Sequence, residues 1–257
     1  MHLKFSKYQA TGNDFIMIDG RHQQIHLQVE DIAQWCHRRF GIGADGIIVL
    51  KNHPELDFEM DYYNADGSQS FCGNGSRCAQ AFANQLGMIK THSRFLAIDG
   101  IHQGKEVQEG YATHMSDVNA DRIETIEEDY LIHTGSPHFI RFVDQLDDYE
   151  VVSMGRSIRN SPHFAKEGVN VNFVSIDDGH ISVRTYERGV ENETYSCGTG
   201  VTAAAIAFLI KTERALNEVA IHTKGGNLAV ELRPKDKQSF DEIWLKGPAV
   251  RVFSAEL

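Results

Sequence analysis

Two short segments of this chain are near-copies of each other, and each carries a cysteine. The first is Cys72-Gly73-Asn74-Gly75 and the second is Cys197-Gly198-Thr199-Gly200. A run of small residues with a helical pattern follows each, SRCAQAFA after the first and VTAAAIAF after the second. Two cysteines placed alike in two related halves predict one site with two facing thiols. Such a pair suits removal of a proton from one face of a carbon and delivery of a proton to the other.

Each of these cysteines precedes the start of a predicted helix. Unpaired backbone N–H groups point outward there, and the helix dipole adds positive potential. Both effects stabilise a thiolate, and the same N–H groups can hold a carboxylate. The glycines let a ligand approach the backbone closely. The pattern therefore predicts an activated thiol and a carboxylate site on one element.

The other two cysteines are interpreted differently. Cys36 lies in the helix-like run DIAQWCHRRF, and Cys78 lies one turn inside the first small-residue helix. We expect both to be small buried hydrophobic residues. The four cysteines have no zinc-ligand spacing, so we predict neither a metal site nor a disulfide framework.

Two further residues are candidates to tune the thiols. His138 follows Gly135-Ser136-Pro137 at a matched position of the repeat described below, which distinguishes it from the other histidines. Glu187 ends a predicted strand that leads to Cys197, and its neighbour Arg188 could bind a carboxylate bidentately.

The elements that must position these residues form a long-period repeat. Residues 58–64 and 181–186 alternate like strands, and each pattern is followed by a turn and then by its cysteine. Residues 11–16 resemble residues 134–140 with one insertion, and residues 41–46 correspond to residues 167–170. Three matched segments in the same order predict a duplicated α/β unit, with the halves meeting near residue 117.

The amino-acid composition limits which classes of protein this chain can belong to. The chain has 257 residues, 41% of them hydrophobic and 24% charged, as in a soluble globular protein with one or two domains. The net charge of -11 argues against nucleic-acid binding, which favours a basic surface. No secretory signal is visible at the start, and the longest apolar stretch, 203–210, is too short to span a bilayer. We therefore expect a cytoplasmic protein that binds neither nucleic acid nor membrane.

Several motifs together resemble one known family, the diaminopimelate epimerases. The motifs are Thr11-Gly12-Asn13-Asp14-Phe15, Asn64-Ala65-Asp66-Gly67-Ser68, Cys72-Gly73-Asn74-Gly75-Ser76-Arg77-Cys78, Glu187-Arg188-Gly189, Cys197-Gly198-Thr199-Gly200 and Gly247-Pro248-Ala249 with Val252-Phe253. The resemblance covers nearly the whole chain. It implies an α/β (α+β) fold with two pseudo-symmetric domains, each a β-sheet wrapped around a central helix. The domains would be residues 1–117 plus 248–257, carrying Cys72, and residues 118–247, carrying Cys197.

The resemblance also implies an activity. It is the interconversion of LL- and meso-2,6-diaminopimelate, an isomerase reaction of lysine and peptidoglycan biosynthesis. The family needs neither pyridoxal phosphate nor metal and usually forms homodimers, so no cofactor is expected. The predicted mechanism uses two bases, one cysteine as thiolate and the other as thiol.

The resemblance also implies roles for individual residues at the positions that match the family motifs. Cys72 and Cys197 match the catalytic pair, and His138 and Glu187 match groups thought to modulate them. The positions that match substrate contacts are Asn13, Asn64, Gly73, Asn74, Asn170, Glu187, Arg188, Gly198 and Thr199.

The sequence also departs from the family pattern. Ser136 stands where many members have asparagine, and Gly46 stands where some have glutamine. The loop from Ser68 to Cys72 looks one residue shorter than usual, and the loop from Glu187 to Cys197 looks one residue longer. These differences bear on recognition of the distal end of the substrate.

Two other functions are compatible with parts of the pattern. One is a related racemase or isomerase of the same fold, proline-racemase-like or phenazine-biosynthesis-like. The other is a thiol redox protein that joins Cys72 to Cys197, although redox pairs usually lie close in sequence as C-x-x-C. A plain binding module is a third and weaker option, because it would not need two activated thiols.

Overall fold

The computed structural model describes residues 3–256, which divide into two compact units. The first unit runs to Thr113 and includes the segment from Gly247, and the second unit is His114–Lys246. The boundaries expected from the sequence, near residues 117 and 248, lie close to these. Each unit is described below by itself.

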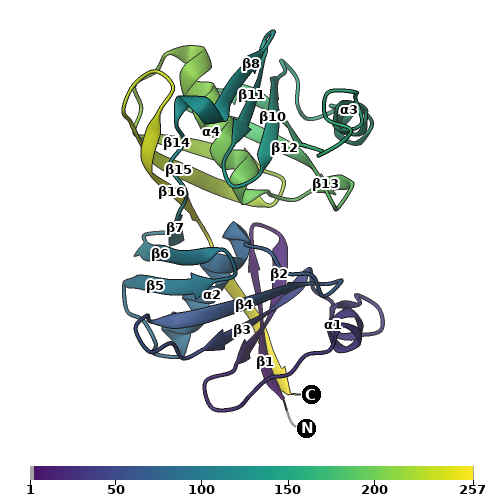
Figure 1. The fold of residues 1–257 in the computed structure, drawn as a ribbon, viewed down its shortest axis with the longest axis vertical. Helices are drawn as coiled ribbons and strands as arrows, with labels where there is room; N and C mark the ends of the chain where they lie inside the picture. The colour runs from purple at the N-terminus through teal and green to yellow at the C-terminus, as the bar shows by residue number, and fades with distance from the viewer. Residues whose placement is uncertain (1–2, 257) are drawn as a thin grey trace. The chain divides into compact units, whose positions relative to one another are not determined.

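The first unit contains the helices α1 and α2, and all of its strands belong to one sheet (Figure 1). Its elements are β1 (Lys4–Ala10), β2 (Asn13–Asp19), α1 (Val29–Cys36), β3 (Gly46–Lys51), β4 (Phe58–Asn64), α2 (Gly73–Gln85), β5 (His92–Ala97), β6 (Gly100–Val107), β7 (Gly110–His114) and β17 (Val250–Glu256).

The second unit contains two α-helices, a short 3₁₀ helix and its own series of strands. Its elements are η1 (Ala120–Arg122), β8 (Ile123–Ile126), β9 (Asp129–His133), β10 (Pro137–Phe142), α3 (Val151–Arg159), β11 (Asn170–Asp177), β12 (His180–Glu187), β13 (Asn192–Thr194), α4 (Gly198–Thr212), β14 (Glu218–Thr223), β15 (Gly226–Pro234) and β16 (Phe240–Gly247).

The strands of the two units pair in the same pattern. The first unit has the order β17-β1-β2-β3-β4-β5-β6-β7. The second has the order β8-β9-β10-β11-β12-β14-β15-β16. In both, the third and fifth pairings are parallel and the rest are antiparallel. The units are therefore pseudo-symmetric, as the sequence repeat predicts.

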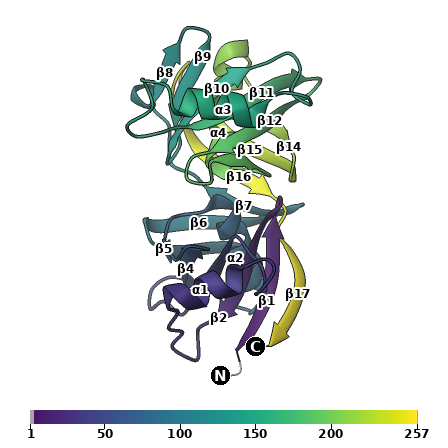
Figure 2. The ribbon, with the colours of Figure 1, turned by 90° about the vertical axis from the view of Figure 1, so that its right-hand side faces the viewer.

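One strand breaks the simple order along the chain. β17, from the C-terminus, takes the place in the first unit that β8 holds in the second, and it pairs antiparallel with β1. Figure 2 shows β17 beside β1, although they come from opposite ends of the sequence. The first unit is thus completed only when the last strand has been made.

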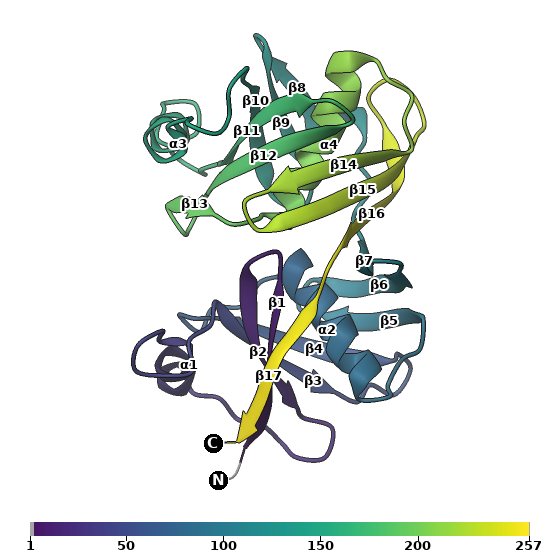
Figure 3. The same ribbon diagram turned by 180° about the vertical axis from the view of Figure 1, so that it is seen from behind.

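A central helix lies against the sheet of each unit (Figure 3). α2 packs on β1–β4, and α4 packs on β9–β12, β14 and β15. Residues 200–209 of α4 are buried without a break, because the helix consists of small and apolar residues that can pack on all sides. α2 instead buries polar side chains, Ser76, Arg77 and Gln80, close to Cys72.

The other helices cover the opposite faces of the sheets. In β3, Ile48 and Leu50 belong to the core around α2, whereas Ile47 and Val49 belong to the core around α1. This alternation follows from the two-residue period of a strand. α3 covers the second sheet in the same way, over β11 and β12. Within residues 3–256, no helix is both long and apolar enough to cross a membrane.

Candidate active site

Cys72 is the N-cap residue of α2. Its backbone is extended, with φ −132° and ψ 112°, and its Sγ accepts a hydrogen bond of 3.3 Å from the N–H of Gly75. This N–H lies in the first helical turn and has no acceptor within the helix. The predicted placement of a thiol at a helix N-terminus is therefore confirmed. A hydrogen bond from a helix N–H stabilises the thiolate form of Cys72.

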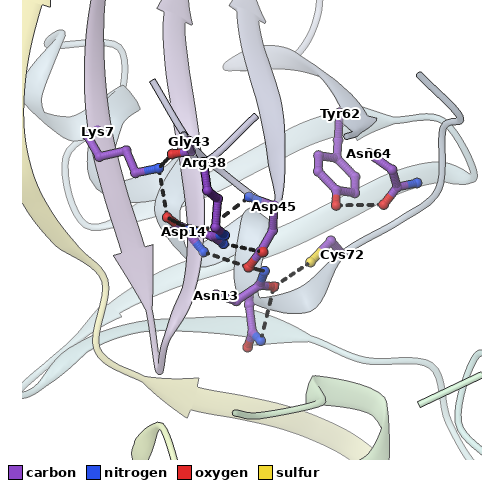
Figure 4. A network of polar contacts seen from close by, with 10 residues as sticks. Lys7, Asn13, Asp14, Arg38, Gly43, Asp45, Tyr62, Asn64 and Cys72 are labelled. Carbon is purple, nitrogen blue, oxygen red and sulfur yellow. Dashed lines mark hydrogen bonds and ion pairs between the residues drawn. The ribbon is translucent and has the colours of Figure 1, made fainter. Parts of the chain in front are cut away.

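Asn13 faces the same sulfur from the start of β2 (Figure 4). Its Oδ1 lies 3.6 Å from Cys72 Sγ and 3.5 Å from Asn74 Nδ2. Its Nδ2 donates to Asp45 Oδ2 at 2.6 Å, so the carboxylate fixes which end of the amide faces the thiol. Cys72 therefore meets an oxygen acceptor, to which its S–H form can donate.

A charged network holds Asp45 in place. Arg38 bonds both Asp14, at 2.7 and 3.1 Å, and Asp45, at 2.6 Å, and Lys7 pairs with Asp14 at 2.7 Å. Burial alone would raise the pKa of Asp14, but hydrogen bonds from Arg38 and Lys7 hold that pKa below its usual value. The network keeps the Asp14 carboxylate ionised near the Cys72 site (Figure 4).

A fully buried arginine lies one turn into α2. Arg77 donates from Nη2 to Asn74 Oδ1 at 2.9 Å and to Thr11 Oγ1 at 3.3 Å. Among residues 3–256, its Nε and Nη1 have no hydrogen-bond partner. Burial lowers the pKa of Arg77 to about 10, and the nearby Cys72 and Cys78 oppose that shift. Its positive charge adds to the helix N-terminus in favouring a Cys72 thiolate.

Asn64 ends β4 and organises the loop after it. Its Oδ1 accepts from the hydroxyl of Tyr62 at 2.7 Å, and its Nδ2 donates to Ser68 and to Ser70 at 3.1–3.3 Å. The amide predicted to contact substrate is thus also a structural anchor of the loop that leads to Cys72.

Gly46 is explained by the ring of Tyr62. A Cβ at position 46 would lie 2.5 Å from Tyr62 Cε2 and 2.4 Å from the carbonyl oxygen of Tyr63. A real Cβ essentially never lies this close to a non-bonded atom, so a larger residue would push β3 and β4 apart. The chain has glycine here because Tyr62 fills the space that a side chain at position 46 would need.

Gly46→Gln is therefore expected to lower the free energy of unfolding by about 1–3 kcal/mol, the usual cost of overpacking a core. The denaturant midpoint, followed by far-UV circular dichroism, measures this. Gly46→Gln combined with Tyr62→Ala should recover part of the loss, because the ring clash is removed while the Tyr63 carbonyl stays. A wild-type midpoint for the single variant would contradict the assigned role of Tyr62.

Cys197 is the N-cap residue of α4, in the position equivalent to Cys72. Its backbone is extended, with φ −121° and ψ 113°, and it is buried. Its Sγ lies 3.6 Å from the hydroxyl of Thr199. A hydroxyl can donate to sulfur, whereas the Asn13 carbonyl in the first unit can only accept. The two thiols thus have equivalent backbone positions but different polar neighbours.

His138 reaches Cys197 through Thr199. Its Nε2 lies 2.8 Å from Thr199 Oγ1 and 2.9 Å from Ser136 Oγ, and its Nδ1 lies 3.2 Å from Asn172 Nδ2. The ring is fully buried. Burial first, and then the charges of His133 and Arg188, lower the pKa of His138 to about 3. The imidazole is therefore neutral at physiological pH.

Asn170 and Arg188 are held together at the ends of β11 and β12. The N–H of Arg188 donates to Asn170 Oδ1 at 2.9 Å, and Asn170 Nδ2 donates to Ser136 Oγ and to Pro137 O, both at 3.2 Å. The Arg188 side chain donates to the carbonyl of Glu167 at 2.8 Å. Ser136 joins Asn170 to His138, since its Oγ contacts both side chains.

Glu187 is the last residue of β12. Its Oε2 accepts from the Thr194 hydroxyl at 3.0 Å, across the pairing of β12 with β13. β13 lies within the loop between Glu187 and Cys197. Glu187 is partly exposed, with its backbone next to Arg188.

The first turns of α2 and α4 contain the backbone N–H groups that the sequence predicts to bind a carboxylate. The helices begin at Gly73 and Gly198, directly after their cysteines, so the N–H groups of Gly73, Asn74, Gly198 and Thr199 belong to the first turns. Such groups bind anions well, because the helix dipole adds to their hydrogen bonds.

The two remaining cysteines are buried as predicted. Burial raises the pKa of Cys36 to about 11 and raises the pKa of Cys78 strongly. Both are held as thiols and are not nucleophiles. Across residues 3–256, no group of three or more His, Cys, Asp and Glu side chains could hold a metal ion.

Sequence reasoning missed the residues that hold the predicted ones in place. Asn172, Asp45 and Tyr62 set the orientations of His138, Asn13 and Asn64. A signal for one of them was available: Asn170 and Asn172 alternate in the otherwise apolar strand NVNFV, so both must lie on one face of β11. The others depend on strand register, which the sequence pattern did not define.

Solved structures with the same fold define the class of this protein. A PhzF-family phenazine biosynthesis protein from Bacillus anthracis matches with a TM-score of 0.76 and 14% identity, covering 100% of this chain and 99% of that one. A hydroxyproline epimerase from Agrobacterium vitis matches with a TM-score of 0.66 and 14% identity, covering 100% and 92%. The chain therefore has the two-unit α/β fold that these proteins share. Its relatives by sequence, given next, are isomerases.

Those relatives are close. The diaminopimelate epimerase of Flavobacterium psychrophilum is 44% identical over 99% of this chain and 100% of its own length. That of Aquifex aeolicus is 35% identical over 99% and 98%. The family model described as diaminopimelate epimerase matches residues 5–120 and 130–252. The chain belongs to the diaminopimelate epimerase family.

Proposed function

We propose that this protein interconverts LL- and meso-2,6-diaminopimelate with Cys72 and Cys197 as its two acid–base groups. The observation that carries the proposal is the equivalent placement of the two thiols. Each is the N-cap residue of the central helix of its unit, in units with the same strand order. Family membership supports the choice of substrate.

The reaction needs one thiolate and one thiol. The thiolate removes the α-proton, so that the C–H bond breaks, its electron pair stays on the α-carbon and an S–H bond forms. The other S–H then breaks and its proton joins the opposite face of the carbon, which inverts the centre. The enzyme finishes with the protonation states of its cysteines exchanged.

The main barrier is the weak acidity of the α-proton. N–H groups in the first turns of α2 and α4, those of Gly73, Asn74, Gly198 and Thr199, bind the carboxylate beside the reacting carbon. They stabilise the negative charge that spreads onto it. Since they are backbone groups fixed by the helices, they need no reorganisation when the charge develops.

The thiols are tuned by different neighbours. His138 acts on Cys197 through Thr199, and Glu187 contributes charge after β12. The distal amino-acid end of the substrate is bound by the side chains of Asn13, Asn64, Asn170, Glu187 and Arg188. Their lack of symmetry lets the site distinguish the reacting end from the end that must stay unchanged.

Further proposals concern the domains, the location, the biosynthetic role, the cofactor requirement and the assembly of the protein. The halves, residues 1–117 with 248–257 and residues 118–247, are the two domains that supply one cysteine each. The protein acts in the cytoplasm, in lysine and peptidoglycan precursor synthesis, without a cofactor. It works as a homodimer, and the exposed apolar side chains of β17, Val250, Val252 and Phe253, support a buried contact there.

A reaction in D₂O tests the proposed function. Starting from LL-diaminopimelate, the meso product should carry one α-deuterium from its first turnover, because the new proton comes from a thiol that exchanges with solvent. Parallel assays on proline and hydroxyproline should show no turnover. Activity on these substrates alone, or no isomerisation of diaminopimelate by folded protein, would contradict the proposal. A stable Cys72–Cys197 disulfide in an inactive protein would favour a redox role instead.

A further inference from the structure

The side chain of Asn172 has a fixed orientation. It is fully buried on β11. Its Oδ1 accepts from the Thr185 hydroxyl at 2.9 Å, and its Nδ2 donates to the carbonyl of Phe139 at 3.1 Å. Exchange of the two ends of the amide would bring its oxygen against the Phe139 oxygen. The amide nitrogen, and not the oxygen, must therefore face His138.

This orientation decides where the proton of His138 is. Asn172 Nδ2 lies 3.2 Å from His138 Nδ1 and can only donate. Nδ1 must accept, so the single proton of the neutral imidazole is on Nε2. The charged groups that act on the ring are His133, from β9, and Arg188, after β12. Both are basic and oppose a second proton, so they favour the neutral ring.

The proton on Nε2 in turn orients the hydroxyl of Thr199. Nε2 lies 2.8 Å from Thr199 Oγ1 and 2.9 Å from Ser136 Oγ, and with its proton in place neither hydroxyl can donate to it. The hydroxyl proton of Thr199 must then point elsewhere, and Cys197 Sγ lies 3.6 Å away. The other neighbour, Ser136 Oγ, lies 3.4 Å away, which is longer than an ordinary hydrogen bond between two hydroxyl groups.

We propose that Asn172 is a positioning residue for the Cys197 thiol: it holds His138 in the Nε2–H tautomer, and the Thr199 hydroxyl therefore donates to Cys197 Sγ. The inference rests on the proposed function only in taking Cys197 to be catalytic. With the other tautomer, Nε2 would accept from Thr199 and the hydroxyl would turn away from the sulfur. The relay from Asn172 thus favours the Cys197 thiolate.

The first unit has no equivalent relay among the contacts described. There the neighbour of Cys72 is the Asn13 carbonyl oxygen, which accepts from the S–H. Asn172 therefore creates a difference between two thiols whose backbones are equivalent.

Nitrogen NMR of the wild-type protein tests the tautomer without any substitution. With ¹⁵N-labelled histidine, and His138→Asn to assign the signal, His138 should show a protonated Nε2 and an unprotonated Nδ1. The pattern should not change between about pH 5 and 9, because burial lowers the pKa of His138 to about 3. A proton on Nδ1, or titration within this range, would overturn the proposal.

Alkylation of Cys197 tests the consequence. The rate of its modification by iodoacetamide, resolved by peptide mass spectrometry, rises with pH as the thiolate forms. In Asn172→Leu the midpoint of that rise should move up by about one pH unit, the loss of roughly one hydrogen bond to the thiolate. The Cys72 profile should not move. Thr185→Val removes only the hydroxyl that donates to the Asn172 amide oxygen. It should shift the Cys197 midpoint in the same direction as Asn172→Leu, but by less.

Ser175→Ala is the matched control. It removes a buried hydroxyl from the same strand, where Ser175 bonds Asp177, and should leave both profiles at their wild-type midpoints. An unchanged Cys197 profile in folded Asn172→Leu, with His138 still in the Nε2–H form, would overturn the proposal. Since neither readout uses turnover, an inactive enzyme that passes both tests would contradict the proposed function and leave this inference standing.

Discussion

Replacement of Cys72 or Cys197 by alanine is expected to lower kcat in both directions by about 10²- to 10⁴-fold, the usual contribution of a positioned acid–base group. The loss should be similar for the two variants, because each turnover needs one thiolate and one thiol. Separation of the LL and meso isomers by chiral chromatography, starting from each isomer in turn, measures both rates.

Each single-cysteine variant should still exchange the α-proton with solvent at one face of the carbon. The remaining thiolate can remove an α-proton from the one face it meets and return a solvent deuteron to that face. In D₂O, one variant should therefore exchange the α-proton of the LL centre and the other that of the opposite centre, without isomerisation. Exchange of both isomers by one variant would contradict the two-thiol scheme, because a single sulfur would then reach both faces.

Cys36→Ala is the control for the loss of a thiol as such. Cys36 is buried in the core around α1, and burial raises its pKa to about 11. This variant should retain wild-type kcat, with only a stability cost from the small cavity. Full turnover by Cys72→Ala would remove the basis of the proposed mechanism.

The fold could be predicted where the sequence has strong local patterns. The alternation at 58–64 and around 181–186 corresponds to β4 and β12, and the small-residue runs correspond to α2 and α4. The prediction of a duplicated unit was correct because equivalent turns recur at equivalent places in the two halves. Periodicity could not give the pairing of β17 with β1, which joins opposite ends of the chain through long-range register.

The site could be predicted for its reacting groups and less for the groups that support them. A cysteine before a helix start is visible in the sequence, since the following glycines and small residues define where the helix begins. The partners of His138 are Ser136 before β10, Asn172 in β11 and Thr199 in the first turn of α4, and they meet only because of tertiary packing and the register of β10 with β11. Asp45 reaches Asn13 for the same reason, through the parallel pairing of β2 and β3.

The same register makes one glycine sensitive to substitution. Gly200→Ala is expected to lower kcat/KM by about 10²-fold, the cost of a misplacement of about 1 Å at a catalytic group. The new Cβ would lie 2.5 Å from Asn172 Oδ1 and 3.3 Å from His138 Cε1. Asn172 cannot move away without breaking its bonds to Thr185 and Phe139, so the displacement is passed to His138 and to Thr199.

Gly75→Ala tests the equivalent position in the first unit and should have little effect on kcat/KM. There the new Cβ would meet Ile48 Cδ1, the end of a flexible side chain, at 3.2 Å and Cys72 Sγ at 3.5 Å, an ordinary contact, and the N–H that donates to this sulfur is retained. The Cβ of the preceding cysteine would lie at 3.3 Å in both units. Alanine is also about 1 kcal/mol more favourable than glycine in a helix, which offsets the tight contact.

Both variants change the third residue after an N-cap cysteine, so any effect on the helix itself should be shared. A large difference in kcat/KM with similar denaturation midpoints would therefore come from what lies against each Cβ: an aliphatic side chain in the first unit and the Asn172–His138 pair in the second. Equal losses would mean that the helix start, and not this polar pair, limits the reaction.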